Sequence, residues 1–177
     1  MQGLFEFEQD GRYPLRRIPM IMRFNLDACG IKISLTAWIT LSRNEREELL
    51  TLPCASESER DFYRTRIAAM LVQHADNPDA VIEFVEIEAA PAWKDSATLP
   101  QNMIDSLQEL GLPLPDLAQW AALNDLQRFA LIKLTRSGHK NANLLPAMKE
   151  FGLISMWYFP SIECTDLLPL VLHRIKS

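Results

Sequence analysis

Apolar residues recur with helical spacing over most of this chain, and two segments share one pattern. Residues 19–54 and 100–136 each begin with a proline, continue with apolar residues three or four positions apart and reach a glycine eleven positions later. Such spacing indicates a helix with one buried face, and glycine is common just beyond a helix end. A tryptophan and paired leucines follow each glycine. Each segment therefore predicts a helix, a glycine turn, a short helix and a further helix.

Ten residues are identical between the two segments at a nearly constant separation. The separation is 81 residues up to the glycine and 82 beyond it, because the second segment has one extra residue in its 112–115 turn. The identical pairs are Pro19/Pro100, Met22/Met103, Leu26/Leu107, Gly30/Gly111, Leu35/Leu117, Trp38/Trp120, Leu41/Leu123, Arg46/Arg128, Leu49/Leu131 and Leu52/Leu134. We interpret them as an internal repeat whose tryptophans and leucines lie in one shared core. Two copies are too few for an extended solenoid.

Polar residues mark where several of these helices begin. Two pairs of residues have the three-residue spacing of a capping box, Ser42 with Glu45 and Asn124 with Gln127. In this motif each of the two side chains accepts a hydrogen bond from the backbone amide of the other residue. Ser34 and either Pro115 or Asp116 are expected to start the short helices. Further helices are predicted over residues 56–75 and 144–151.

Two short stretches have strand character instead. Residues 4–8 alternate apolar and acidic side chains, and residues 81–88 are rich in β-branched residues. A lone strand is unstable, so residues 81–88 are expected to pair with residues 4–8 or with a C-terminal segment. The predicted fold is mainly α: a single compact helical domain over residues 1–177, built from two related helix–turn–helix–helix units with a minor short β element. A linker with a strand spans residues 76–99, where Trp93 is expected to hold it on the core, and residues 154–177 form a C-terminal extension.

Composition and charge exclude several function classes. The chain has 177 residues, 48% of them hydrophobic, and a formal net charge of −5 with a pI near 5.2. An acidic protein lacks the basic surface that neutralises phosphates, so binding to nucleic acid is not expected. No apolar run approaches the roughly 20 residues of a membrane helix, and residues 1–17 lack a signal-peptide pattern. We expect a cytoplasmic protein that does not bind membranes, and self-association stays open.

The residues that support catalysis or metal binding do not form a known motif here. Cys29, Cys54 and Cys164 are widely spaced, which predicts free thiols, and no histidine stands near a cysteine or four residues from another ligand. There is no nucleophile elbow, phosphate-binding glycine loop or zinc-protease motif. We therefore expect no cofactor, no metal and no catalytic residues.

One group of polar and basic residues surrounds the turn that follows the second repeat. A helix N-terminus presents free amides to an anion, and neighbouring cations would add attraction, so this turn is a candidate site for an anionic ligand or an acidic partner. The alternative is that Lys133 and Arg136 complement the end of the preceding helix while the loop is solvated. The candidate residues are Lys133, Arg136, His139, Lys140, Asn141 and Asn143.

Three stretches together resemble a known bacterial family. They are LQRFALIKLTRSGHKNANLLPAMKEFGL at residues 126–153, IPMIMRFNLDACGIKISL at residues 18–35 and PAWKD at residues 91–95. The likeness is to the nitrate reductase-associated proteins, found chiefly in cyanobacteria and proteobacteria, and it extends over residues 4–153. It implies a cytoplasmic accessory role near nitrate reductase, a molybdenum enzyme, and implies no catalytic residues.

Three functional hypotheses follow. The first is a non-catalytic accessory or interaction protein of nitrate assimilation, whose partner is nitrate reductase or a maturation factor. The second is a small-molecule binder or enzyme that uses the turn at residues 136–143. The third is a DNA-binding regulator, because each repeat has a helix–turn–helix order, although the net negative charge opposes it.

Overall fold

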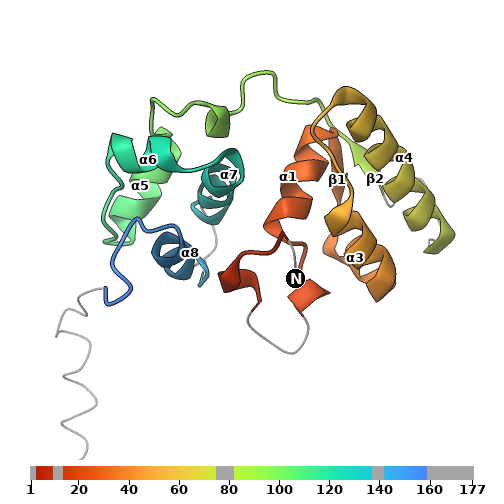
Figure 1. Cartoon of the computed structure of the whole chain (residues 1–177), viewed down its shortest axis with the longest axis horizontal. Coiled ribbons are helices and arrows are strands. Elements are labelled where there is room, and N and C mark those ends of the chain that lie inside the picture. The colour runs from red at the N-terminus through yellow and green to blue at the C-terminus, as the bar shows by residue number, and fades with distance from the viewer. Residues whose placement is uncertain (1–2, 10–13, 75–81, 137–141, 159–177) are drawn as a thin grey trace, which may run out of the picture.

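Two groups of helices lie side by side, and α1 (Met20–Ala28) and α7 (Asp125–Leu134) face each other where the groups meet (Figure 1). The computed structural model describes residues 3–9, 14–74, 82–136 and 142–158. These residues form eight α-helices and one two-stranded antiparallel sheet, which confirms the prediction of a mainly α fold with a minor β element.

The first unit contains α1, the sheet and three further helices. Its elements are β1 (Ile31–Ile33), α2 (Leu35–Thr40), α3 (Arg43–Thr51), α4 (Glu57–His74) and β2 (Ile82–Phe84). The second unit contains α7 and its neighbours, namely α5 (Gln101–Glu109), α6 (Leu117–Ala122) and α8 (Leu144–Glu150). Short 3-10 turns lie at Glu6–Glu8, Pro14–Arg16 and Ala92–Lys94. The order of helices within each segment is the predicted one.

Local sequence signals set most helix ends. Ser34, Ser42, Asp116 and Asn124 each accept a hydrogen bond from the amide three residues ahead, as helix caps do. The predicted capping boxes at Ser42 and Asn124 are present. Pro19 and Pro100 occupy the N-cap position, one residue earlier than their expected place in the first turn.

The glycines that follow α1 and α5 both adopt left-handed backbone conformations. Gly30 and Gly111 each have φ +63°, a region that side chains with a Cβ atom rarely enter. At Gly30 a Cβ atom would lie 2.7 Å from the carbonyl oxygen of Val85, whereas at Gly111 it would meet open space. Gly30 therefore also permits the chain after β2 to pass close by.

Buried apolar residues form two clusters, one in each unit, rather than the single shared core that we expected. Trp38 lies in the first cluster and Trp120 in the second, and both are fully buried. Leu41, Leu49, Leu123 and Leu131 are also buried, as predicted, whereas the paired leucines Leu35 and Leu117 are 49% and 56% exposed and do not lie in the core. Burying a side chain of leucine size contributes roughly 1.5–3 kcal/mol, so these residues are major contributors to stability. Each cluster lies within one unit, while α1 and α7 contact each other between the units.

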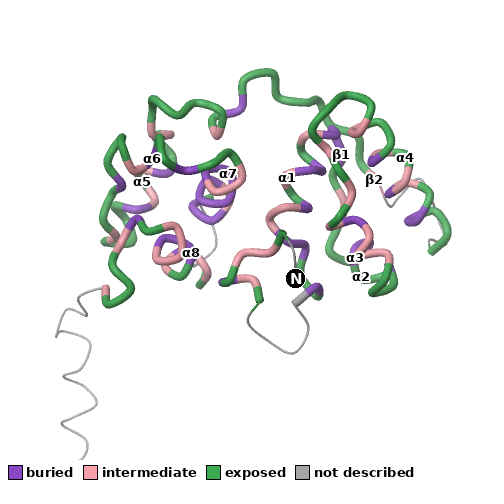
Figure 2. The backbone as a smooth tube through the Cα atoms, viewed as in Figure 1, coloured by how far each residue is buried: buried purple, intermediate pink, exposed green. Residues whose placement is uncertain are grey.

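The two clusters meet through aromatic side chains between α1 and α7. The ring of Phe24 lies 4.8 Å from that of Trp93 and 5.3 Å from that of Phe129, measured between centroids. Trp93 thus holds the linker against both units, as expected. Figure 2 shows that α7 is buried on most sides, and six of its residues are buried. It is the helix around which the second unit packs.

The N-terminal segment connects the same two units. The Glu150 carboxylate accepts hydrogen bonds from the amides of Glu6 (2.8 Å) and Phe7 (3.0 Å), while the Glu8 carboxylate accepts one from Met20 at the start of α1 (2.7 Å). Residues 4–8 were predicted to form an edge strand, which is wrong, because Glu6–Glu8 is a 3-10 turn with Phe7 buried. Amides bonded to carboxylate side chains are not offered to a neighbouring strand.

The partner of β2 also differs from the prediction. β2 pairs with β1, with Ile31 opposite Phe84 and Ile33 opposite Ile82, and not with residues 4–8. Residues 31–33 were expected to be a plain connection between helices. Their side chains alternate between buried and solvent-facing, as in a strand, because Ile31 lies in the first cluster and Lys32 is exposed.

Candidate functional site

The predicted basic turn is divided by the fold, beginning with Lys133. Its ammonium nitrogen lies 2.7 Å from Oδ2 of Asp27 on α1 and 5.0 Å from the ring centroid of Phe129. The Lys133 side chain is only 17% exposed. It therefore joins α7 to α1 and already has an anionic partner.

The other candidates follow α7 or lie outside the described residues. Arg136 is exposed directly after α7, and Asn143 precedes α8, where its side chain makes no capping bond. His139, Lys140 and Asn141 lie outside the described ranges. α8 has seven residues, too few to present a strong N-terminal dipole. Binding of an anion at this turn stays a prediction. Lys133 is not counted among the binding residues, because Asp27 already pairs with it.

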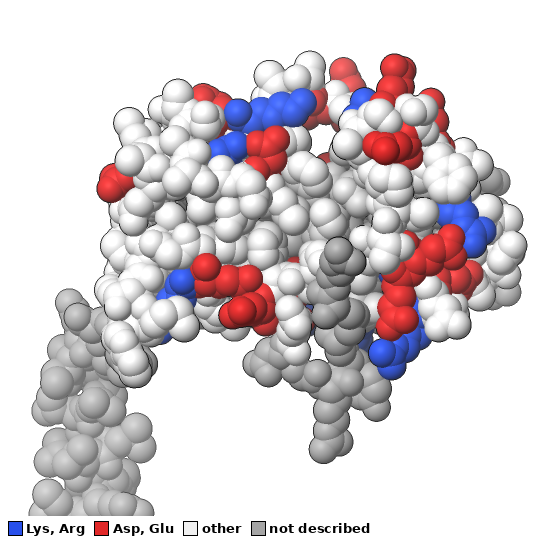
Figure 3. All heavy atoms as spheres, viewed as in Figure 1, with Lys and Arg blue, Asp and Glu red and all other residues white. Residues whose placement is uncertain are grey.

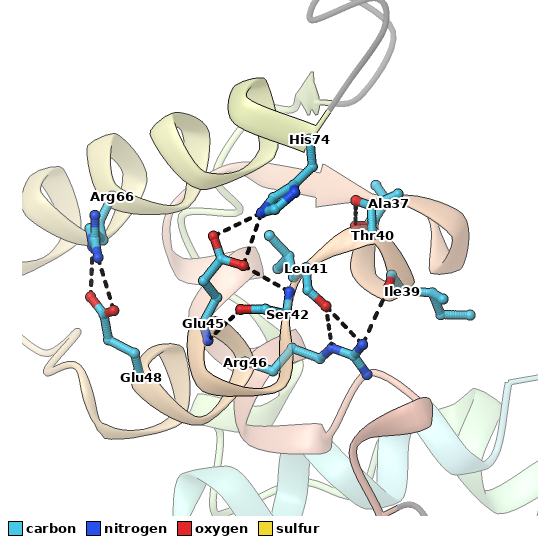
Figure 4. Close-up of polar contacts among 10 residues, drawn as sticks. All are labelled: Ala37, Ile39, Thr40, Leu41, Ser42, Glu45, Arg46, Glu48, Arg66 and His74. Carbon is cyan, nitrogen blue, oxygen red and sulfur yellow. Dashed lines mark hydrogen bonds and ion pairs between the residues drawn. The ribbon is translucent and has the colours of Figure 1, made fainter.

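A second polar cluster, which sequence reasoning did not assemble, lies between α3 and α4. Figure 4 shows His74 and Arg66 of α4 pointing toward two glutamates of α3. Nε2 of His74 lies 2.9 and 3.0 Å from the carboxylate oxygens of Glu45, and Arg66 forms two hydrogen bonds with Glu48 at 2.6 and 2.9 Å. Paired histidine and carboxylate groups can perform acid–base chemistry.

The surroundings of Glu45 indicate a structural role instead. The same carboxylate accepts the amide of Ser42 at 2.7 Å, which closes the capping box of α3. Partial burial raises the pKa of Glu45, but the hydrogen bonds from Ser42 and His74 together outweigh it and hold that pKa below its usual value. For Glu48, the hydrogen bonds from Arg66 are the largest influence and lower the pKa. Both carboxylates are therefore ionised at neutral pH and fix the start of α3 to α4.

Metal and membrane sites can be assessed over the same residues. Within the described ranges no group of three or more His, Cys, Asp or Glu side chains is placed to hold a metal ion. Of the helices in these ranges, none has the length and apolar content needed to span a bilayer.

Three exposed apolar side chains of the first unit lie close together in one short stretch of chain, residues 82–88, which we call the acidic–apolar strip. Phe84 is 70% exposed, Val85 38% and Ile87 48%. Three exposed glutamates lie between or beside these apolar residues, namely Glu83, Glu86 and Glu88. Apolar side chains grouped in this way are typical of protein contact surfaces.

The backbone of the strip has one open edge. The amide of Val85 donates to the carbonyl of Gly30 (2.9 Å). Along an antiparallel strand every second residue is hydrogen-bonded to the same neighbour, so β2 bonds to β1 through the residues at even spacing from Val85. Ile82 and Phe84 lie at odd spacing from Val85, so their backbone N–H and C=O groups point away from β1. The sheet has two strands in the described part of the chain, so this outer edge of β2 is unpaired there. An unpaired edge accepts an added strand.

Charge distinguishes the strip from a neutral edge. Lys32 pairs with Glu83 at 2.9 Å, and within the described residues Glu86 and Glu88 have no ion-pair partner. Figure 3 shows acidic side chains gathered over the first unit, while the middle of the same face carries few charges. The sequence already indicated that this segment is exposed. Successive side chains of a strand point to opposite faces, and in residues 81–88 both faces carry carboxylates, so neither face can be buried.

Comparison with known families identifies the chain. Residues 4–151 match the family described as conserved nitrate reductase-associated protein. The chain belongs to this family. The match includes residues 19–54 and 100–136, the acidic–apolar strip and α8. No curated protein and no solved structure matches the chain. Family membership, as the resemblance predicted, links the protein to nitrate reductase.

Proposed function

We propose that this chain is a non-catalytic accessory protein of nitrate assimilation that binds nitrate reductase or one of its maturation factors. The link to nitrate reductase comes from the family. The observation that favours a binding role is the acidic–apolar strip, in which the exposed side chains of Phe84, Val85 and Ile87 lie beside an edge of β2 that is unpaired in the described part of the chain.

The chemistry of the strip selects the kind of partner. The open edge of β2 offers backbone hydrogen bonds to an extended segment, and the apolar side chains offer contact area to it. The carboxylates of Glu86 and Glu88 would attract a segment that carries Lys or Arg. The partner segment is therefore expected to be extended, partly apolar and basic.

The test is affinity capture from nitrate-grown source cells with the tagged chain as bait. The wild-type chain is expected to recover nitrate reductase or a maturation factor, identified by mass spectrometry. The double variant Phe84→Ser, Ile87→Ser is expected to lose at least tenfold of this recovery, because these side chains lie at the centre of the surface. Raising the salt concentration is expected to weaken recovery, since exposed charges are screened.

The matched control is Leu117→Ser on α6, which replaces an exposed apolar side chain (56%) outside the strip. This variant is expected to recover the partner as well as the wild-type chain does. Equal recovery by the strip variant and the wild type, with both shown to be folded by circular dichroism, would refute the strip as the binding surface. Repeated capture of neither partner would refute the proposed function itself.

A further inference from the structure

Two cysteines that are far apart in the sequence meet in the first unit. Cys29 caps the end of α1, and Cys54 lies in the connection between α3 and α4. Their sulfur atoms are 3.4 Å apart, and both residues are free thiols. A disulfide requires the two sulfurs to approach to about 2.05 Å, so a small adjustment of the side chains is sufficient.

The two thiols differ in their access to solvent. Cys29 is 1% exposed and belongs to the first hydrophobic cluster, whereas Cys54 is partly buried at its edge. A soluble oxidant therefore reaches Cys54 first. Cys29 is sheltered but lies within contact distance of whatever forms on Cys54.

The surroundings also favour a thiolate on Cys54. The hydrogen bond from Cys29 is the largest influence and lowers the pKa of Cys54, while burial raises it. The nearby guanidinium groups of Arg60 and Arg64 lower it further, whereas the carboxylate of Glu59 raises it. For Cys29 the same hydrogen bond, followed by burial, raises the pKa. The thiolate is the reactive form of cysteine, so the more accessible member of the pair is also the more nucleophilic.

We propose that Cys29 and Cys54 form a reversible oxidation site. The two thiols give two electrons to a peroxide and become a disulfide. The Cys54 thiolate attacks one oxygen of hydrogen peroxide, the O–O bond breaks, and the released hydroxide takes up a proton to become water. Cys54 is then a sulfenic acid. Cys29 attacks its sulfur, the S–O bond breaks, and the hydroxyl leaves with the Cys29 proton as a second water. The two thiols lose two electrons in total and the peroxide gains them.

The test uses the full chain with Cys164→Ser, which leaves only Cys29 and Cys54 as thiols. The protein is treated with hydrogen peroxide, then unfolded and alkylated in denaturant so that buried thiols also react, and digested with trypsin. Cleavage after Lys and Arg places Cys29 in peptide 24–32 and Cys54 in peptide 47–60, so a disulfide joins two separate peptides. We expect the linked peptides in most of the sample, and their loss after dithiothreitol.

Single variants test the order of the steps. With Cys29→Ala, peroxide is expected to leave a sulfenic acid on Cys54 that dimedone traps, because the resolving thiol is missing. With Cys54→Ala, Cys29 is expected to remain alkylatable. If dimedone labelled Cys29 and not Cys54, the proposed order would be overturned.

A stability measurement shows whether the disulfide forms in the native fold. A bond that closes the loop between residues 29 and 54 of the folded chain is expected to raise Tm by roughly 5–10 °C, an increase that dithiothreitol reverses. Complete alkylation of both cysteines after peroxide treatment would refute the site. A disulfide that lowered Tm would also refute it, since the native fold would then oppose the bond.

Discussion

Arg128 in the second unit shares two contacts with Arg46 in the first. Each guanidinium lies over the ring of a buried tryptophan, 5.8 Å from the Trp38 centroid for Arg46 and 6.0 Å from the Trp120 centroid for Arg128. Each also donates to the carbonyl at the end of a short helix, that of Leu41 or Leu123. The internal repeat stays a prediction, and these matched contacts of identical residues favour it.

Replacement of Arg128 by lysine is expected to destabilise the fold. Arg128 is 6% exposed, and its Nε atom donates to the carbonyl of Trp93 at 2.7 Å while another nitrogen donates to that of Leu123. An ammonium group cannot reproduce the planar arrangement of these bonds. A buried carbonyl left without a donor makes the expected loss about 2–3 kcal/mol, measured as a lower urea midpoint.

Two further substitutions calibrate that effect. Arg46→Lys is expected to cost less, about 1–2 kcal/mol, because Arg46 is only partly buried and water can replace lost bonds. Arg43→Lys, at a side chain that is 78% exposed, is expected to change stability by about 0.5 kcal/mol or less. If all three lysine variants unfolded at the same urea concentration, the structural role of Arg128 would be wrong.

Gly30→Ala and Gly111→Ala form a matched pair. Both place an alanine at φ +63°, which costs roughly 1–2 kcal/mol. Only at Gly30 does the new Cβ atom also meet the carbonyl of Val85 and the side chain of Ile87. Gly30→Ala is therefore expected to lose about 1–3 kcal/mol more than Gly111→Ala in denaturant unfolding. Equal losses would contradict the close approach of residues 85–87 to Gly30.

The ion pair between Lys133 and Asp27 can be measured by a double-mutant cycle. Because the Asp27 side chain is 48% exposed, the coupling energy between the two residues is expected to be about 0.5–1 kcal/mol and to decrease as salt is added. Lys133→Ala is expected to cost more than Asp27→Ala, since the ammonium group of Lys133 also lies over the ring of Phe129. A coupling energy of zero at low salt would show that the pair does not hold the two units together.

The depressed pKa of Glu45 predicts how the stability depends on pH. A carboxyl whose pKa is lower in the folded than in the unfolded state stabilises the fold above its unfolded value, here 4.5, and this contribution is lost as the pH falls through the lower folded value. Glu45→Gln is therefore expected to be less stable than the wild type by about 0.5–1 kcal/mol at pH 7. The two proteins are expected to converge once the pH falls below the folded pKa of Glu45. The measurement is urea unfolding at several pH values, and a difference that grew toward low pH would contradict this assignment.

Much of the candidate surface could have been inferred from residues 81–88, yet its location could not. Carboxylates on both faces of that segment indicate exposure. The pairing of β2 with β1 joins residues about fifty positions apart, and residues 31–33 have no feature that names their partner. Sequence reasoning therefore offered residues 4–8 or a C-terminal segment as the partner of β2, did not find β1, and left the open edge of β2 unrecognised.

By itself, the sequence determined the helices, their capping residues and the buried tryptophans and leucines. These depend on contacts within about four residues, so periodicity and caps report them directly. Only the tertiary structure decided that Lys133 pairs with Asp27, that Cys54 meets Cys29, and that the core is divided in two. Such contacts depend on how whole helices pack against one another, which is set by shape and burial across the entire chain and leaves no local pattern to read.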